Sequence, residues 1–356
     1  MVPKGSARNP EAEKLPEFAS FDLLRFALAS AVMLSHIGIL KWVQTGNLAV
    51  QVFFALSGWL IGGILCRTEA RELSRFYFNR STRIWIPFAF AIFALYLVSY
   101  LHEPVRSGRW WEFLVYDVTF SHNWFTLRPD AGVALQQMPL HGTGNHFWSL
   151  AVEEQFYLIA PLIMTLLPVG KRILPWVVIA AIAYGGASQY GAISLGVLAA
   201  VAANRRADWY RRRLATTALL LIAAVSGAAM NYPSIYVYAA PLFAVCAVLL
   251  CARPSRRNAA TRWLGGISFP FYLNAWMGTF VLHFIEKKLQ LDRGGYWLGV
   301  EFLAGVAAAA VTYWLIDARV MAHRNAYYNA PLGWALGATG YMLIITGVVL
   351  WSFIGR

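Results

Sequence analysis

Long apolar stretches, separated by short polar segments, follow one another through nearly the whole chain. A helix that crosses a bilayer needs about 20 mostly apolar residues. Eleven stretches meet this requirement, at 19–40, 47–66, 84–101, 146–168, 172–187, 188–203, 214–230, 232–252, 263–283, 296–316 and 332–353. The pattern therefore predicts an all-α, polytopic membrane helix bundle. Between 172–187 and 188–203 the chain must make a very tight turn at Gly185, Gly186 and Ser188.

The basic residues between these stretches predict the orientation of the bundle. Cytoplasmic segments of membrane proteins carry an excess of Lys and Arg. With the amino terminus in the cytoplasm, the inner segments hold 21 basic residues and the outer segments hold 8, while Arg25 lies within the first stretch. We therefore expect a cytoplasmic amino terminus and an extracytoplasmic carboxyl terminus.

The composition excludes several classes of protein. Hydrophobic residues make up 59% of the 356 residues and charged residues only 13%, against roughly 45–50% and 25% in soluble domains. A soluble enzyme, a disordered chain and a secreted disulfide scaffold are excluded, and the three cysteines lie inside apolar stretches. The net charge of +13 follows from the basic inner segments, so we expect no nucleic-acid partner.

One connection, 102–145 on the predicted outer side, is much longer than the others. It contains Trp110, Trp111 and Trp124 together with several histidines. Long ordered loops are usually functional, and aromatic residues favour the membrane interface. We expect a functional segment that lies at the interface; the alternative is a partly disordered connector.

Ionisable residues inside the predicted helices are the candidates for chemistry, because such charges generally face a bundle interior or an aqueous cavity. Arg25 and His36 are eleven residues apart, which places them on nearly the same helical face, about 16 Å apart along the axis. Glu153 lies about two turns below the outer surface and His36 about one turn below it. The two side chains are therefore predicted to meet across a cavity, where a carboxylate can orient an imidazole base.

These residues also have simpler explanations. Taken alone, His36 fits a core histidine whose ring is bonded to a backbone carbonyl. Glu153 and Glu154 are explained if at least one of the two carboxylates faces the bundle interior or a water-filled crevice.

The inner segment 67–83 collects five arginines. Arginine forks match phosphate geometry, so a cluster beside a cavity is a candidate clamp for a phosphorylated cofactor. Topology alone also requires arginines here, and anionic lipids attract them. We favour the topological explanation for Arg67 and Arg71 and the functional one for Arg80 and Arg83, which stand where the third helix begins.

Four sequence elements occur in a fixed order along the chain. They are Arg25 followed by ten residues and His36, Phe53-Phe54-Ala55-Leu56-Ser57-Gly58, Arg80-Ser81-Thr82-Arg83-Ile84-Trp85-Ile86-Pro87, and Trp148-Ser149-Leu150-Ala151-Val152-Glu153-Glu154-Gln155-Phe156-Tyr157-Leu158. Together they resemble the acyltransferase-3 family of integral-membrane acyltransferases, which modify extracytoplasmic sugars in bacteria. The resemblance covers roughly residues 18–325.

The resemblance implies how the chain is divided. It implies a cytoplasmic tail at 1–18, a ten-helix membrane acyltransferase core at 19–330, and one additional C-terminal transmembrane helix at 331–356. Two positions depart from the family pattern. Asn274 stands where the family commonly has a histidine, and Asp317 stands where it usually has a glutamate.

The resemblance also implies an activity and a location. A membrane-bound O-acyltransferase of the bacterial inner membrane would transfer an acyl group, with acetyl expected, from cytoplasmic acyl-coenzyme A to a hydroxyl of an extracytoplasmic glycan or glycolipid. His36 is the predicted general base and Glu153 its orienting or charge-balancing partner; a covalent acyl intermediate on His36 stays an open alternative. Membrane lipids are the other expected partners, and no metal is expected.

The remaining site residues are predicted to bind the two substrates. Phosphates of the coenzyme are assigned to Arg25, Arg80 and Arg83. The Ser57-Gly58 turn of the second predicted helix is expected to let the pantetheine arm approach closely, since glycine permits tight backbone contact. The acceptor side is assigned to Ser149 and Tyr157.

Two other classes of function also fit intramembrane charges. A glycolipid or sugar transporter would move its substrate without consuming acyl-coenzyme A. A noncatalytic membrane subunit of a polysaccharide assembly complex would do neither. The sequence determines neither the acceptor, nor the acyl chain, nor the oligomeric state.

Overall fold

A computed structural model describes residues 17–103, 108–125, 131–291 and 294–354. Within these ranges the chain is helical and contains no strand, only one isolated bridge between Phe18 and Ser255. The all-α fold is therefore confirmed. The predicted tail at 1–18 lies almost entirely outside the described residues. The α-helices are α1 (Ala19–His36), α2 (Thr45–Leu65), α3 (Leu73–His102), α4 (Gly108–Val118), α5 (His122–Phe125), α6 (Ala131–Ala134), α7 (Phe147–Pro161), α8 (Ile173–Gly185), α9 (Gly191–Arg205), α10 (Arg213–Ala229), α11 (Pro233–Cys251), α12 (Ala259–Leu289), α13 (Trp297–Thr312), α14 (Ala318–Tyr327) and α15 (Ala330–Ile354).

Each of the eleven predicted apolar stretches contains a helix. By length and composition, 6 helical segments of the described chain can cross a membrane, namely Thr45–Leu65, Ala70–His102, Phe147–Leu166, Pro233–Cys251, Trp297–Tyr327 and Ala330–Phe353. Helices α8, α9 and α10 are apolar but shorter. The polytopic membrane bundle is thus confirmed as a class, and the count of eleven crossings stays a prediction.

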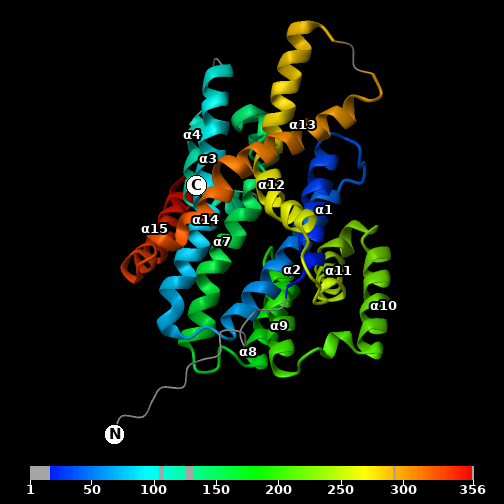
Figure 1. Cartoon of the computed structure of the whole chain (residues 1–356), viewed down its shortest axis with the longest axis vertical. Coiled ribbons are helices and arrows are strands. Elements are labelled where there is room, and N and C mark those ends of the chain that lie inside the picture. Colours follow the sequence, from blue (N-terminus) through cyan, green and yellow to red (C-terminus); the bar gives the residue numbers. More distant parts are fainter. Residues whose placement is uncertain (1–16, 104–107, 126–130, 292–293, 355–356) are drawn as a thin grey trace.

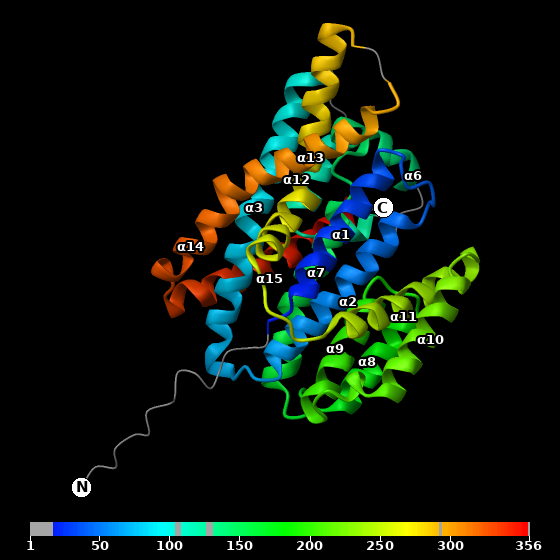
Figure 2. The same ribbon diagram turned by 45° about the vertical axis from the view of Figure 1, so that its right-hand side comes forward.

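The helices form two groups around a shared core. Helices α8–α11 lie together at one side of the molecule, and α14 and α15 lie at the opposite side (Figures 1 and 2). The most extensive helix contacts are those of α2 with α9, of α12 with α13, and of α1 with α12. Helix α7 touches both α2 and α3, so residues of α7 lie close to those of its two neighbours.

Glycines allow α2 and α9 to approach very closely. A Cβ atom on Gly58 would lie 2.1 Å from the carbonyl oxygen of Ile193, and one on Gly196 would lie 2.3 Å from that of Ala55. No side chain larger than hydrogen fits at either position without moving a backbone. Ser57 and Gly58 both lie inside the regular helix α2, within the predicted second span.

The third helix begins earlier than the sequence predicts. Helix α3 starts at Leu73, so Arg80 and Arg83 lie within a helix and not in the inner segment before it. Leu73, Phe76 and Tyr77 are buried, a spacing of three and four residues that gives this polar-looking stretch one apolar helical face. The average hydropathy of the stretch does not reveal that apolar face. Because the stretch is helical, Arg80 and Arg83 project from the helix α3 and not from a loop.

The predicted span 296–316 is also longer in the structure. Helix α13 continues through a π-helical turn at Tyr313–Asp317, labelled η6, into α14. The helical path therefore reaches Tyr327, beyond the predicted end.

The described part of the long connection at 102–145 is packed onto the bundle. Helix α4 buries Trp110, Phe113 and Tyr116. Just after α4, His122 Nδ1 lies 2.6 Å from Oδ1 of the buried Asp117. This segment is therefore a structured part of the molecule, although 104–107 and 126–130 lie outside the described residues.

Segments assigned to the same side of the membrane meet in the structure. On the predicted inner side, Lys171 Nζ donates to the carbonyl oxygen of Thr68 at 2.6 Å. On the predicted outer side, the hydroxyl of Tyr236 donates to Oδ1 of Asn47 at 2.9 Å. These contacts agree with the alternation of helices on which the predicted orientation depends.

Helix α15 joins two helices that carry candidate site residues. Its Tyr341 hydroxyl donates to the carbonyl oxygen of Leu158 in α7 at 2.6 Å. The same hydroxyl lies 3.0 Å from that of Tyr77 in α3. Helix α15 thus fixes α3 and α7 relative to each other.

Candidate active site

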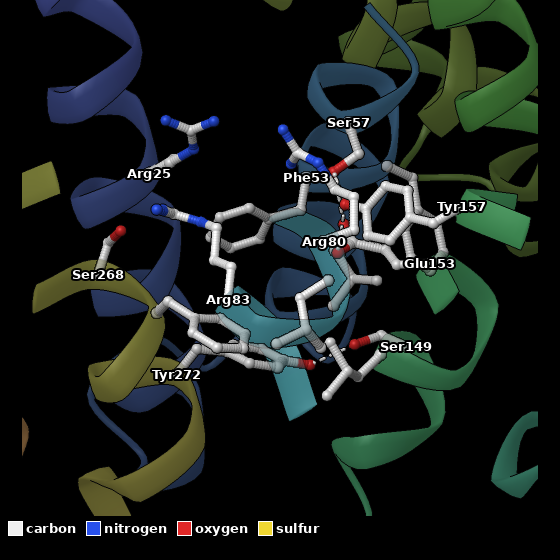
Figure 3. Close-up of a pocket in the computed structure, with 15 residues that line it drawn as sticks. Arg25, Phe53, Ser57, Arg80, Arg83, Ser149, Glu153, Tyr157, Ser268 and Tyr272 are labelled. Atoms are coloured by element: carbon white, nitrogen blue, oxygen red, sulfur yellow. Dashed lines mark hydrogen bonds between the residues drawn. The ribbon is translucent and has the colours of Figure 1, made fainter. Parts of the chain in front are cut away.

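A cavity of about 110 Å³ lies where α1, α2, α3, α7 and α12 meet (Figure 3). We call it the arginine cavity, since three guanidinium groups line it. Figure 3 shows these groups gathered toward one side, while Ser149 and Tyr272 lie at the other. The polar lining residues are Arg25, Ser57, Arg80, Arg83, Ser149, Glu153, Tyr157, Ser268 and Tyr272.

Glu153 is held in the wall of this cavity by two hydroxyl donors. Ser57 Oγ donates to its Oε1 at 2.7 Å, and the hydroxyl of Tyr157 donates to its Oε2 at 3.1 Å. Tyr157 and Ser57 are also within hydrogen-bond distance of each other, at 3.2 Å. Hydrogen bonds to both oxygens fix the orientation of the carboxyl group.

The three arginines give the cavity a surplus of positive charge, because Glu153 is the only carboxylate among its described lining residues. Arg25 has a loose ion pair with Asp22, at 3.9 Å. The Arg80 guanidinium lies 5.9 Å from the centre of the Tyr157 ring, and its Nε is buried with no partner in the described chain. A guanidinium donor without an acceptor beside a cationic cavity fits an anionic group such as a phosphate.

Two neighbours of the predicted site residues have other roles. The carboxylate of Glu154 accepts a 2.8 Å hydrogen bond from Trp85 Nε1, and Glu154 does not line the arginine cavity. Arg71 pairs with Glu69 at the exposed end of η1 (Ala70–Glu72), at 2.8 Å. Arg71 therefore lies at the surface, as expected for an arginine whose role is to set the orientation of the protein in the membrane.

A second cavity of about 560 Å³ adjoins the first, and we call it the histidine cavity. Its lining includes His36 at the end of α1 and His146 at the start of α7. His36 Nδ1 lies 2.7 Å from the carbonyl oxygen of Val32. Because a carbonyl oxygen accepts a proton, Nδ1 of the neutral ring carries the hydrogen and Nε2 keeps a lone pair. A free Nε2 lone pair is what a general base requires.

Tyr272 and Val50 line both cavities and form the wall between them. The hydroxyl of Tyr272 donates to the carbonyl oxygen of His146 at 2.9 Å and lies 2.7 Å from Ser149 Oγ. A phenol ring of α12 is therefore fixed to the first turn of α7, at the boundary between the cationic cavity and the imidazole cavity.

The structure does not place all predicted site residues together. Arg25, Ser57, Arg80, Arg83, Ser149, Glu153 and Tyr157 share the arginine cavity. His36 lies in the adjoining cavity, and the described hydrogen bonds of Glu153 go to Ser57 and Tyr157 instead. The predicted contact between His36 and Glu153 is therefore not present, because matching depth in the membrane does not determine which cavity a side chain enters.

Gly58 does not line the arginine cavity either. It faces α9, where the carbonyl oxygen of Ile193 occupies the space of a side chain. Its lack of a Cβ serves helix packing, so the assignment of Gly58 to the coenzyme is replaced by a structural explanation.

The sequence interpretation missed Tyr272 and His146. Ser268 and Tyr272 are four residues apart in α12, which places both on the cavity-facing side of that helix. This spacing was the available signal for Tyr272. His146 immediately precedes α7, and only the tertiary structure shows that it shares a cavity with His36.

Asn274 and Asp317, the two departures from the family pattern, are outside both cavities. Asn274 is 1% exposed, and its Oδ1 has no partner among the described residues. Asp317 ends the π-helical turn η6. No group of three or more metal-ligating side chains was found in the described part of the chain.

The helix bundle thus holds a cationic cavity beside a cavity lined by two imidazoles. Residues 18–351 match the model of the acyltransferase-3 family, described as an acyltransferase domain, and the chain belongs to this family. The predicted family is therefore confirmed, and with it the prediction that the protein is an acyltransferase.

Similar proteins are named as O-acetyltransferases. The chain is 28% identical over 150 residues to O-acetyltransferase OatA of Staphylococcus aureus (strain NCTC 8325 / PS 47). The aligned residues make up 41% of this chain and 24% of that protein. It is 27% identical over 168 residues to the putative O-acetyltransferase SACOL0978 of Staphylococcus aureus (strain COL), covering 45% and 27%. The chain thus matches about a quarter of the length of these curated relatives. No solved structure matches it.

Proposed function

We propose that this protein transfers an acyl group, with acetyl expected, from acyl-coenzyme A on the cytoplasmic side to a hydroxyl of a glycan or glycolipid on the outer side of the bacterial inner membrane. Membership of an acyltransferase family supports the reaction class. Relatives named O-acetyltransferases support acetyl as the group and a hydroxyl as the acceptor.

The observation that carries the proposal is that the arginine cavity and the histidine cavity share a wall. The arginine cavity has three guanidinium groups, of which Arg80 has an Nε without a partner among the described residues, and such groups suit the phosphates of a coenzyme. The histidine cavity has an imidazole with a free Nε2 lone pair, which suits a hydroxyl that must lose its proton. A donor bound in one cavity and an acceptor bound in the other would meet at Tyr272 and Val50.

With the predicted orientation, the arginine cavity lies toward the cytoplasm and the histidine cavity toward the outside, which suits transfer of an acyl group across the membrane. Arg25 lies nearer the predicted cytoplasmic end of α1, and His36 lies at its outer end. A thioester approaching from the cytoplasm would therefore reach the arginines first, and an outer hydroxyl would reach His36 first. The division of the chain into a core at 19–330 and an additional helix at 331–356 belongs to the same proposal.

The chemistry requires a base and fixed geometry, because a thioester is already activated. The acceptor oxygen forms an ester bond with the acyl carbon, and the bond from that carbon to sulfur breaks. The hydroxyl proton moves to Nε2 of His36 and then to the departing sulfur. Arg25, Arg80 and Arg83 hold the anionic part of the donor, and Ser57 and Tyr157 hold the Glu153 carboxylate beside them.

In this proposal Glu153 acts through the arginines. It lies in the same cavity as the three guanidinium groups, where its negative charge balances part of theirs. Without this carboxylate, the three positive charges would bind the phosphates of the coenzyme product more tightly, which would slow its release. Ser149 then serves the acceptor side by fixing Tyr272, to which it is hydrogen bonded.

Purified full-length protein in lipid nanodiscs provides the test. We expect calorimetry to detect binding of coenzyme A, and we expect radiolabel from acetyl-coenzyme A to enter an acceptor only when the protein is present. Movement of a labelled sugar across the membrane without consumption of acetyl-coenzyme A would support a transporter instead. Binding of neither ligand would support a noncatalytic subunit.

A further inference from the structure

The histidine cavity contains hydrogen-bond acceptors that lack donors. Asn145 and His146 both line it. Oδ1 of Asn145 and Nε2 of His146 are each buried with no hydrogen-bond partner among the described residues. Buried polar groups are normally paired, so two such atoms in adjacent residues at one cavity indicate that a ligand supplies the donors.

The protonation of His146 can be derived from its surroundings. Its Nδ1 lies 3.1 Å from the carbonyl oxygen of Thr143, so Nδ1 carries the hydrogen and Nε2 is an acceptor. His36 has the same arrangement with Val32, at 2.7 Å. The two rings line one cavity. The cavity therefore presents two imidazole acceptors and one amide, a set that requires several donors.

The other lining residues indicate what kind of molecule supplies those donors. Lys41 lines the cavity and no carboxylate does so in the described chain, which disfavours a cationic ligand. An anion brings acceptors and would leave Asn145 and His146 unsatisfied. Trp42 and Trp148 provide aromatic surface, and aromatic walls with a few placed polar groups are typical of sites for small organic molecules.

The size of the cavity agrees with such a ligand. Its volume of about 560 Å³ falls within the range of about 300–1,000 Å³ that is usual for small-molecule sites. The arginine cavity, at about 110 Å³, is much smaller.

We propose that Asn145 and His146 form a binding site for a neutral compound with at least two adjacent hydroxyl groups. One hydroxyl reacts at His36, and its neighbour donates a hydrogen bond to Nε2 of His146 or Oδ1 of Asn145. His146 is a binding residue here, and it takes no proton. This inference rests on the proposed function, because the reacting hydroxyl is the acceptor of the acyl group.

Two small probes test the requirement for a second hydroxyl. Full-length protein in nanodiscs is supplied with acetyl-coenzyme A and either trans-cyclohexane-1,2-diol or cyclohexanol. The diol has two reactive hydroxyl groups, which alone would raise its kcat/KM about twofold over cyclohexanol. Beyond this factor, we expect the wild type to prefer the diol by about tenfold, which is the effect of one added hydrogen bond. We expect His146→Phe, which keeps a ring between Phe147 and Tyr272, to remove that preference by raising KM for the diol about tenfold.

Controls separate binding from catalysis and from misfolding. His146→Phe should leave coenzyme A binding unchanged, since His146 does not line the arginine cavity. Asn145→Ala provides a second variant that removes an acceptor at the same cavity. The matched control is His323→Phe, because His323 is exposed on α14 and has the same type of Nδ1 contact, at 2.9 Å from the carbonyl oxygen of Arg319.

Each other outcome overturns a defined part of the proposal. Equal use of both probes per hydroxyl by the wild type refutes the second contact. A wild-type preference in both variants, with coenzyme A binding intact, refutes the assignment to Asn145 and His146. Binding of coenzyme A without acetylation of either probe refutes a site for neutral hydroxyl compounds. Absence of coenzyme A binding by the wild type refutes the proposed function itself, and this inference with it.

Discussion

Ser57 Oγ donates a hydrogen bond to Oε1 of Glu153 at 2.7 Å and so joins α2 to α7 at the wall of the arginine cavity. Ninety-six residues separate the two in the sequence. The contact depends on the close approach of α2 to its neighbours and on the position of α7 between α2 and α3. It fixes the only carboxylate that faces the three guanidinium groups among the described lining residues.

Replacing Glu153 by Gln tests the role of this charge. The change keeps the shape and the Ser57 contact but removes the negative charge, and it turns an amide donor toward the Tyr157 hydroxyl. We expect acyl transfer to fall about 10²-fold, measured by release of coenzyme A thiol. Glu154→Gln is the matched control and should have a smaller effect, because Glu154 binds Trp85 outside the cavity. The reverse order would mean that the catalytically important carboxylate is Glu154.

Replacing His36 by Ala tests the base. We expect transfer to fall by about 10²–10⁴, the usual contribution of a positioned general base, while coenzyme A binding stays near the wild-type value. His323→Ala should retain full activity, because that histidine is exposed on α14. Wild-type turnover by purified His36→Ala protein would assign the base elsewhere.

The arginines can be tested for a role in binding as distinct from topology. Replacing Arg80 or Arg83 by Gln should weaken coenzyme A binding by about 1.5–3 kcal/mol, the range for hydrogen bonds to charged groups, as measured by calorimetry. Lys should restore binding only in part, because an ammonium lacks the bidentate fork. If these residues served only the positive-inside bias, Lys would restore everything.

Arg71→Gln is the control for that series. Arg71 is exposed and pairs with Glu69, and it does not line the arginine cavity. Its replacement should leave the affinity for coenzyme A unchanged. Full binding by both the Arg80→Gln and Arg83→Gln variants would contradict the clamp and leave Arg25 as the remaining candidate.

Two glycines of α2 provide a matched pair for stability. Gly58→Ala places a Cβ 2.1 Å from the Ile193 carbonyl oxygen and should destabilise the protein by about 1–3 kcal/mol through overpacking. Gly63→Ala meets no atom within 4 Å and should be neutral or stabilise by up to about 1 kcal/mol. Thermal unfolding in detergent measures both. Equal unfolding temperatures, with weaker coenzyme A binding for Gly58→Ala, would restore the original assignment of Gly58 to the coenzyme.

The orientation of the bundle can be measured by labelling. In a variant without its three native cysteines, a cysteine after Arg356 should react with an impermeant reagent from outside the cell. A cysteine before Pro3 should react only after permeabilisation. Reaction of both ends from the same side would show an even number of crossings in place of the odd number that the charge pattern predicts.

The sequence by itself determined the helices and several of the side chains that line the two cavities. An apolar stretch long enough to cross a bilayer must be helical there, since a helix satisfies its own backbone hydrogen bonds. The eleven ranges therefore each contain a helix. An arginine, a histidine or a glutamate inside such a stretch must also face inward, and Arg25 and Glu153 do line a cavity.

Only the tertiary structure decided which of these residues meet. Helical periodicity assigns His36 and Glu153 to faces and depths of their own helices, but it says nothing of the rotation of one helix against another. That rotation follows from close packing such as the contact of Gly58 with Ile193, and it places a wall that contains Tyr272 between the two cavities. His36 consequently shares its cavity with His146, while Glu153 faces the arginines, because shape complementarity between helices fixes their mutual register and sequence spacing along one helix does not.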